Sequence, residues 1–157
     1  MNQISASAIG AADDFVAVSV FPKHEDHAVL RSIFRSSDRP LCPGSSWALK
    51  ACTTLDEALL ILKKGGIPLV LCECDLQPGS WKELLSAMEA LPDPPYLIVT
   101  SRHADDRLWA EALNLGAYDV LPAPFDAAEV MRTLSVAWLR WNDREKPQAS
   151  RLAKSAA

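Results

Sequence analysis

The sequence predicts an α/β fold in which a five-stranded parallel sheet is doubly wound, with helices on both faces, as (βα)5. Short apolar runs alternate five times with segments of helical periodicity. The run Leu69–Cys72 is continuously apolar, which is typical of a strand buried on both faces of a parallel sheet. The chain has 157 residues, of which 49% are hydrophobic, and this suits one domain with its own core.

The first predicted elements form a strand–helix–strand segment. Phe15–Phe21 is short, apolar and rich in β-branched residues, which predicts a strand. From His24 to about Arg35 the apolar residues recur at helical spacing, which predicts a helix. Prolines and a glycine then mark a loop, and Trp47–Cys52 is the second predicted strand.

Two capping boxes mark the next two helices. Thr54 with Glu57, and Ser80 with Glu83, each place a hydroxyl three residues before a glutamate and ahead of an apolar helical stretch. Gly65-Gly66 ends the first of these helices, and the central apolar run follows as the third strand.

The remaining elements continue the alternation. Tyr96–Val99 and Tyr118–Leu121 are predicted as the fourth and fifth strands, with a helix over roughly Ala104–Leu115 between them. The last helix follows Asp126, and its apolar stripe runs to Trp141 with a 3.6-residue period. We therefore expect a flexible N-terminal segment at 1–14, a folded domain at 15–142 and a polar tail or linker at 143–157.

Composition excludes several classes of protein. No apolar run approaches the ~20 residues that span a bilayer, and the N-terminus lacks the basic and apolar regions of a signal peptide, so we expect a cytoplasmic protein. The formal net charge of −4 argues against direct nucleic-acid binding. The four cysteines, Cys42, Cys52, Cys72 and Cys74, have no zinc-site spacing and are interpreted as reduced, mostly buried thiols.

Three stretches then carry a family resemblance. They are Glu73–Leu85, Leu97–Ser101 and Asn114–Asp126, each at the carboxyl end of a predicted strand, where sites form in such sheets. Together they resemble the receiver domain of bacterial response regulators over about Phe15–Trp141. The resemblance implies a flavodoxin-like fold and a role in two-component signalling, with a histidine kinase or an output protein as partner.

Receivers carry an acceptor aspartate at the end of the third strand, and two leucine-like residues follow eleven and twelve positions later. Counting back from Leu84 and Leu85 puts Glu73 at the acceptor position. Aligning the loop proline instead puts Cys74 there, but the helix face is the firmer guide. Thr100 matches the family's hydroxyl at the end of the fourth strand.

This chain departs from the receiver pattern at the other positions that carry chemistry. Ala123, before Pro124, stands where the family has a lysine followed by a proline, and we expect the Ala123–Pro124 bond to be cis. The acidic pair that holds magnesium is missing from the end of the first strand, and Glu25 and Asp26 follow a few residues later. The family's switch aromatic is replaced by valine at position 120.

Phosphoryl transfer to a carboxylate depends on a metal ion and a cation that neutralise charge on the phosphoryl oxygens. Without them we expect an atypical pseudo-receiver that binds no cofactor, is not an enzyme and acts through protein contact. In it Glu73 is either a weak mimic of a phosphorylated acceptor or a solvated remnant. The alternative is a phosphorelay receiver phosphorylated at Asp75 or Glu73, with Mg²⁺ held through Glu25 or Asp26.

The histidines and the short motifs of the sequence point to two further classes of site. We expect His24, His27 and His103 to lie in loops on the same edge of the sheet as Glu73, where a transition-metal site is conceivable but isolated surface histidines are commoner. An enzyme of flavodoxin-like or hydrolase type would need a glycine-rich phosphate loop or a G-x-S-x-G elbow, and the sequence has neither.

Trp109 is the candidate anchor for a partner. The core positions of its helix are assigned to Leu108, Ala112 and Leu115, which leaves Trp109 for either partial burial or contact with a partner. The resemblance places it on the face formed by the fourth helix, fifth strand and fifth helix, through which receivers bind partners or form dimers.

Overall fold

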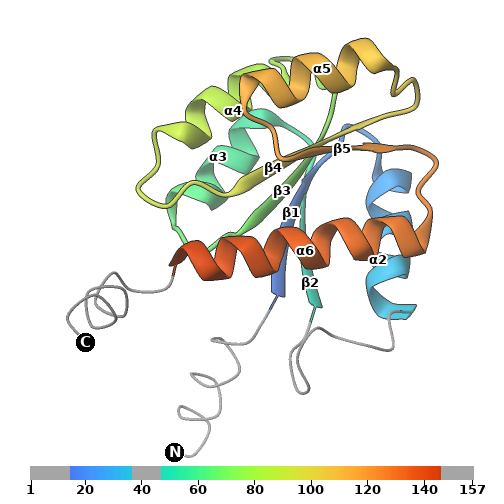
Figure 1. Ribbon diagram of the computed structural model, residues 1–157, viewed down its shortest axis with the longest axis horizontal. Helices are drawn as coiled ribbons and strands as arrows, with labels where there is room; N and C mark the ends of the chain where they lie inside the picture. The colour runs from blue at the N-terminus through green and yellow to red at the C-terminus, as the bar shows by residue number, and fades with distance from the viewer. Residues whose placement is uncertain (1–14, 37–46, 146–157) are drawn as a thin grey trace, which may run out of the picture.

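The computed structural model describes residues 15–36 and 47–145. It contains one parallel sheet of five strands in the order β2-β1-β3-β4-β5, which confirms the predicted fold class (Figure 1). The strands are β1 Phe15–Val20, β2 Trp47–Cys52, β3 Leu69–Glu73, β4 Tyr96–Ser101 and β5 Asp119–Pro122. The helices are α2 His24–Ser36, α3 Leu55–Lys63, α4 Trp81–Glu89, α5 Asp106–Leu115 and α6 Ala127–Glu145.

The helix starts follow from local hydrogen bonds. The Thr54 and Ser80 hydroxyls accept the backbone N–H three residues later, as the capping boxes predict. Asp105 does the same for α5, with its carboxylate accepting the N–H of Leu108 at 2.9 Å. This cap explains why α5 begins at Asp106, slightly later than predicted.

The last helix is longer than the sequence pattern indicates. It continues to Glu145, so residues 143–145 belong to α6 and the predicted domain boundary at 142 falls inside the helix. The Trp141 indole N–H donates to the carbonyl oxygen of Pro94 at 3.2 Å, and the Arg144 guanidinium donates to the same oxygen. These bonds hold the last turns of α6 against the segment before β4. The predicted N-terminal segment 1–14, and residues 146–157 of the predicted tail, lie outside the described residues.

The sheet separates two apolar layers. In β3, Val70 and Cys72 face one core cluster, and Leu69 and Leu71 face the other. Helices α3, α4 and α5 cover the first face, and α2 and α6 cover the second (Figure 1). All four of these β3 side chains are fully buried, which is why this strand has a continuous apolar sequence.

The cysteine prediction is met in part. Cys52 and Cys72 are buried and Cys74 is half-buried, all three as free thiols. Cys42 lies outside the described residues. Within the described part of the chain, no helix has the length and apolarity needed to cross a membrane.

Candidate functional site

Parallel strands bring their carboxyl ends to one edge of the sheet. Here that edge is formed by the ends of β1 at Val20, β3 at Glu73, β4 at Ser101 and β5 at Pro122. The strand order reverses between β1 and β3, because the chain proceeds from β1 outward to β2 and then crosses to β3. Such a switch point is where α/β sheets form their sites.

Glu73 lies at this switch point beside Thr100. The register of β3 and β4 pairs these two residues, so their side chains project from the same face of the sheet. Thr100 is buried, with 2% of its surface exposed, and Glu73 is half-buried. Cys74 already belongs to the loop, where its N–H donates to the Thr100 carbonyl at 2.9 Å. Glu73 is therefore the last residue of β3, and Cys74 is the first residue of the loop that follows.

The environment of Glu73 disfavours its charge. Burial raises the pKa of the Glu73 carboxyl, and the nearby carboxylates of Asp26 and Asp75 raise it further. Arg102 and Lys23 act in the opposite direction but do not cancel the rise. The site thus gathers three acids and two cations within electrostatic reach of one another.

Arg102 is a residue of this site that the sequence analysis did not single out. Its guanidinium lies 3.1 Å from Oδ1 of Asp26 and links the segment after β4 to the first turn of α2. The side chain of Asp26 is only 17% exposed, so this carboxylate is largely shielded from water and paired. The sequence did offer one indication of its place, because Arg102 directly follows β4, whose carboxyl end lies at the same edge of the sheet as Glu73.

Ala123 is the residue at which the family resemblance implies a lysine, and it follows the end of β5. Its N–H donates to the carbonyl oxygen of Ser101 at 2.8 Å, which fixes the backbone after β5 beside the end of β4. The Ala123–Pro124 bond is cis, as expected, and so is Gln77–Pro78. The alanine methyl carries no charge, and the cation that pairs with Asp26 is Arg102, in the segment after β4.

The side chains present do not fit a magnesium site. Magnesium is usually held by one or two carboxylates together with water and phosphate oxygens. Asp26 is already paired with Arg102, and Lys23 adds a second positive charge near Glu73. Glu25 is exposed in the first turn of α2. Among residues 15–36 and 47–145, no three histidine, cysteine or acidic side chains are grouped as metal ligands.

A surface pocket of about 330 Å³ lies next to the two residues that follow Glu73. Its lining includes Cys74 and Asp75, which follow β3, and Ser101 and His103 at the end of β4. Burial raises the pKa of the Cys74 thiol, which keeps it protonated and makes it a poor nucleophile. Asp75 is exposed and lies beyond the end of β3.

The three histidines do not all lie in loops, so the expected loop placement is wrong for two of them. His24 and His27 lie in α2, and only His103 is in a loop. His27 is buried, with Nε2 donating to the Phe21 carbonyl at 3.0 Å and Nδ1 accepting from the Ser19 hydroxyl at 2.6 Å. Burial lowers the pKa of His27, which favours the neutral ring at pH 7. The ring is thus a buried, hydrogen-bonded packing residue.

The face assignments in α5 need one correction. Ala112 is buried and Leu108 packs against the first core cluster, as predicted, but Leu115 is 47% exposed. Leu115 is the last residue of the helix, and Gly116 with φ of 111° turns the chain away. Trp109 is half-buried and packs against the same cluster, which corresponds to the partial-burial interpretation.

No family model matches the sequence, and no curated protein matches it significantly. Solved structures do resemble its fold. The signal receiver domain of a protein described as a Luxo repressor from Vibrio parahaemolyticus superposes with a TM-score of 0.73 at 14% identity, covering 84% of this chain and 95% of that one.

Two further structures give the same result. The signal receiver domain of an HD domain-containing protein from Pseudomonas fluorescens Pf-5 has a TM-score of 0.70 at 20% identity, covering 86% of this chain and 95% of its own. The beryllofluoride-activated NtrC4 receiver domain dimer has a TM-score of 0.68 at 20% identity, covering 80% and 98%. The chain therefore has the flavodoxin-like fold of receiver domains.

Proposed function

We propose that this chain is a pseudo-receiver, a cytoplasmic signalling module of the two-component type that acts by protein contact and is not an enzyme. The observation that carries the proposal is the arrangement at the acceptor position. Glu73 takes the place of the aspartate, Ala123 the place of the lysine, and Asp26 is engaged by Arg102.

The physical argument concerns charge in the transition state. A phosphoryl group in transfer spreads negative charge over its oxygens, and a metal ion with a nearby cation neutralises that charge. Removing one well-placed charge from such a site costs about 2.7–4 kcal/mol. Glu73 also sits among carboxylates that already raise its pKa, so a further dianionic group is strongly disfavoured there. These features support a module that works without phosphorylation and without a bound cofactor.

Treatment with acetyl phosphate and magnesium, followed by intact-protein mass spectrometry, tests this proposal. We expect no added phosphoryl group under conditions that label a working receiver run alongside. A gain of one phosphoryl group that disappears in Asp75→Asn or Glu73→Gln would instead establish the phosphorelay alternative. The same two variants show which carboxylate accepts the group.

The partner surface is proposed on one flank of α5. Glu111 forms an ion pair with Lys82 of α4 at 2.8 Å, so the flank that carries Glu111 faces α4. Trp109 and Leu113 lie two residues to either side, about 200° around the helix, and thus on the opposite flank. Leu113 is 47% exposed beside the half-buried Trp109. An exposed apolar residue beside an aromatic one is typical of a binding anchor.

This flank corresponds to the face named by the family resemblance, here α5, β5 and α6. The NtrC4 receiver domain forms a dimer, and we propose self-association or binding of a kinase or output protein through the same face. Sedimentation over a range of concentrations tests the first possibility. Leu113→Glu is expected to weaken association, whereas Leu60→Glu, at a 64% exposed position on α3, leaves it unchanged. A monomer at all concentrations would leave another protein as the partner.

A further inference from the structure

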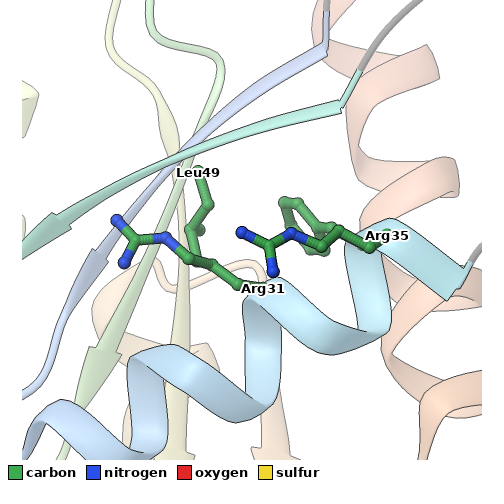
Figure 2. Close-up of a pocket in the computed structure, with 4 residues that line it drawn as sticks. Arg31, Arg35 and Leu49 are labelled. Carbon is green, nitrogen blue, oxygen red and sulfur yellow. The ribbon is translucent and has the colours of Figure 1, made fainter.

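A second pocket lies at the β2 edge of the sheet, and β1 separates that edge from β3, the strand that carries Glu73. It has a volume of about 250 Å³ and is lined by Arg31, Phe34 and Arg35 of α2 and by Leu49 of β2. Figure 2 shows both arginine side chains leaving α2 in the same direction, with Leu49 reaching down beside them. The pocket shares no lining residue with the Glu73 site.

The two arginines are placed so that their positive charges repel each other. They are four residues apart on one helix, so they lie one above the other on the same face and their charges repel. The ion pairs described in the structure are Arg102 with Asp26 and Lys82 with Glu111. Arg31 and Arg35 thus have no acidic partner among the residues that the structure describes. An anion bound between them would remove the repulsion.

The apolar floor of the pocket strengthens the electrostatic attraction that the two arginines exert on an anion. Phe34 is buried, with 6% of its surface exposed, and Leu49 is half-buried against the second core cluster. Charges beside an apolar wall are screened less than charges surrounded by water. The site therefore combines two guanidinium groups with a nonpolar surface on one side.

We propose that Arg31 and Arg35 form a binding site for a phosphoryl group, either as free phosphate or at the end of a small organic phosphate. A guanidinium presents paired N–H donors, and a single carboxylate is satisfied by one such group. A phosphoryl group has three terminal oxygens and nearly two negative charges, so it can accept from both. The small volume suits a head group of this size.

The test is a titration followed by the Arg Nε–Hε signals of the full chain in NMR. Inorganic phosphate, phenyl phosphate and succinate are added at constant ionic strength, balanced with sodium chloride. We expect saturable shifts of the Arg31 and Arg35 signals with both phosphates. Tighter binding of phenyl phosphate would identify an organic phosphate as the source, and equal binding would identify free phosphate.

Substitutions of single arginines show whether binding depends on Arg31 and Arg35. Arg31→Gln and Arg35→Gln are each expected to weaken binding at least tenfold, or about 1.4 kcal/mol. Arg132→Gln on the exposed surface of α6 removes the same charge and should leave binding unchanged. Arg31→Lys keeps the charge but loses the fork, and it should also weaken binding. Absent or non-saturable shifts, equal loss in Arg132→Gln, or succinate binding as tightly as phosphate would overturn the proposal.

Discussion

The guanidinium of Arg102 lies 3.1 Å from Oδ1 of Asp26, although 76 residues separate the two in sequence. The pair joins the segment after β4 to the first turn of α2. Its two members act in opposite directions on Glu73, because Arg102 lowers the pKa of the Glu73 carboxyl and Asp26 raises it. Arg102 therefore supplies positive charge at this site, where a receiver domain would use a metal ion and a lysine.

Replacing Arg102 by glutamine should raise the pKa of Glu73 further. The guanidinium is one of the two groups that hold this pKa down, so its removal leaves the effects of Asp26 and Asp75 less opposed. The ¹³C shift of the Glu73 carboxyl, followed by NMR over pH, measures the change. Because the side chain of Arg102 is 52% exposed, the loss of stability should be at most about 1 kcal/mol.

Arg132→Gln is the matched control for that experiment, because it removes an arginine from an exposed position on α6. An unchanged Glu73 titration in Arg102→Gln would show that the ion pair does not set the charge balance of the site.

Replacing Glu73 by glutamine should stabilise the fold at neutral pH. The pKa of Glu73 is higher in the folded protein than its ordinary value of 4.5, so its ionised form is disfavoured by folding. The stability it contributes is present below pH 4.5 and is lost as pH rises through the folded pKa. Glu73→Gln should therefore raise Tm at pH 7 and have little effect at pH 4. Asp93→Asn, in an exposed loop, should show no such difference.

Local signals predicted the helices and strands well. The caps at Thr54 and Ser80 depend on residues within one turn, and β2 at Trp47–Cys52 has the predicted bounds. The end of α6 was missed because its last turn is held by the Pro94 carbonyl, which is distant in sequence. Leu115 was assigned to the core from periodicity alone, which ignores the turn at Gly116.

The site was predicted less completely, because part of it depends on contacts between residues that are distant in sequence. The pairing of Glu73 with Thr100 follows from which strands end at the same edge, so the sequence could indicate it. The Arg102–Asp26 pair depends on side-chain placement between distant segments and has no local pattern. His27 did have a signal, because it lies three residues before Leu30 on the apolar face of its helix.

Gly79 should tolerate alanine less well than Gly66. Both glycines have positive φ, 89° and 80°, which costs a residue with a side chain about 1–2 kcal/mol. At Gly79 an added Cβ would also lie 2.8 Å from Cδ2 of Leu55, whereas at Gly66 nothing lies within 4 Å. Urea unfolding should show Gly79→Ala to be the more destabilising by about 1–3 kcal/mol. Equal losses would mean that the Leu55 side chain or the β3–α4 loop shifts to make room for the added methyl group.

The buried His27 should make the fold sensitive to mild acid. Burial lowers its pKa below the ordinary value of 6.5, so the folded protein binds fewer protons than the unfolded chain. The stability that neutral His27 contributes is present above pH 6.5 and is lost as pH falls through the folded pKa, by at most about 1.4 kcal/mol per pH unit. Urea unfolding between pH 7.5 and 5.5 measures this slope.

His27→Gln separates this effect from the titration of carboxylates. A glutamine side chain can donate to the Phe21 carbonyl and accept from the Ser19 hydroxyl, but it does not titrate. The variant should therefore lose stability at pH 7.5 through poorer packing, yet its stability should fall less steeply toward pH 5.5 than that of the natural chain. His103→Gln, at an exposed position, should keep the natural slope. If both variants keep that slope, protonation of His27 does not limit stability, because its two hydrogen bonds tolerate the charged ring.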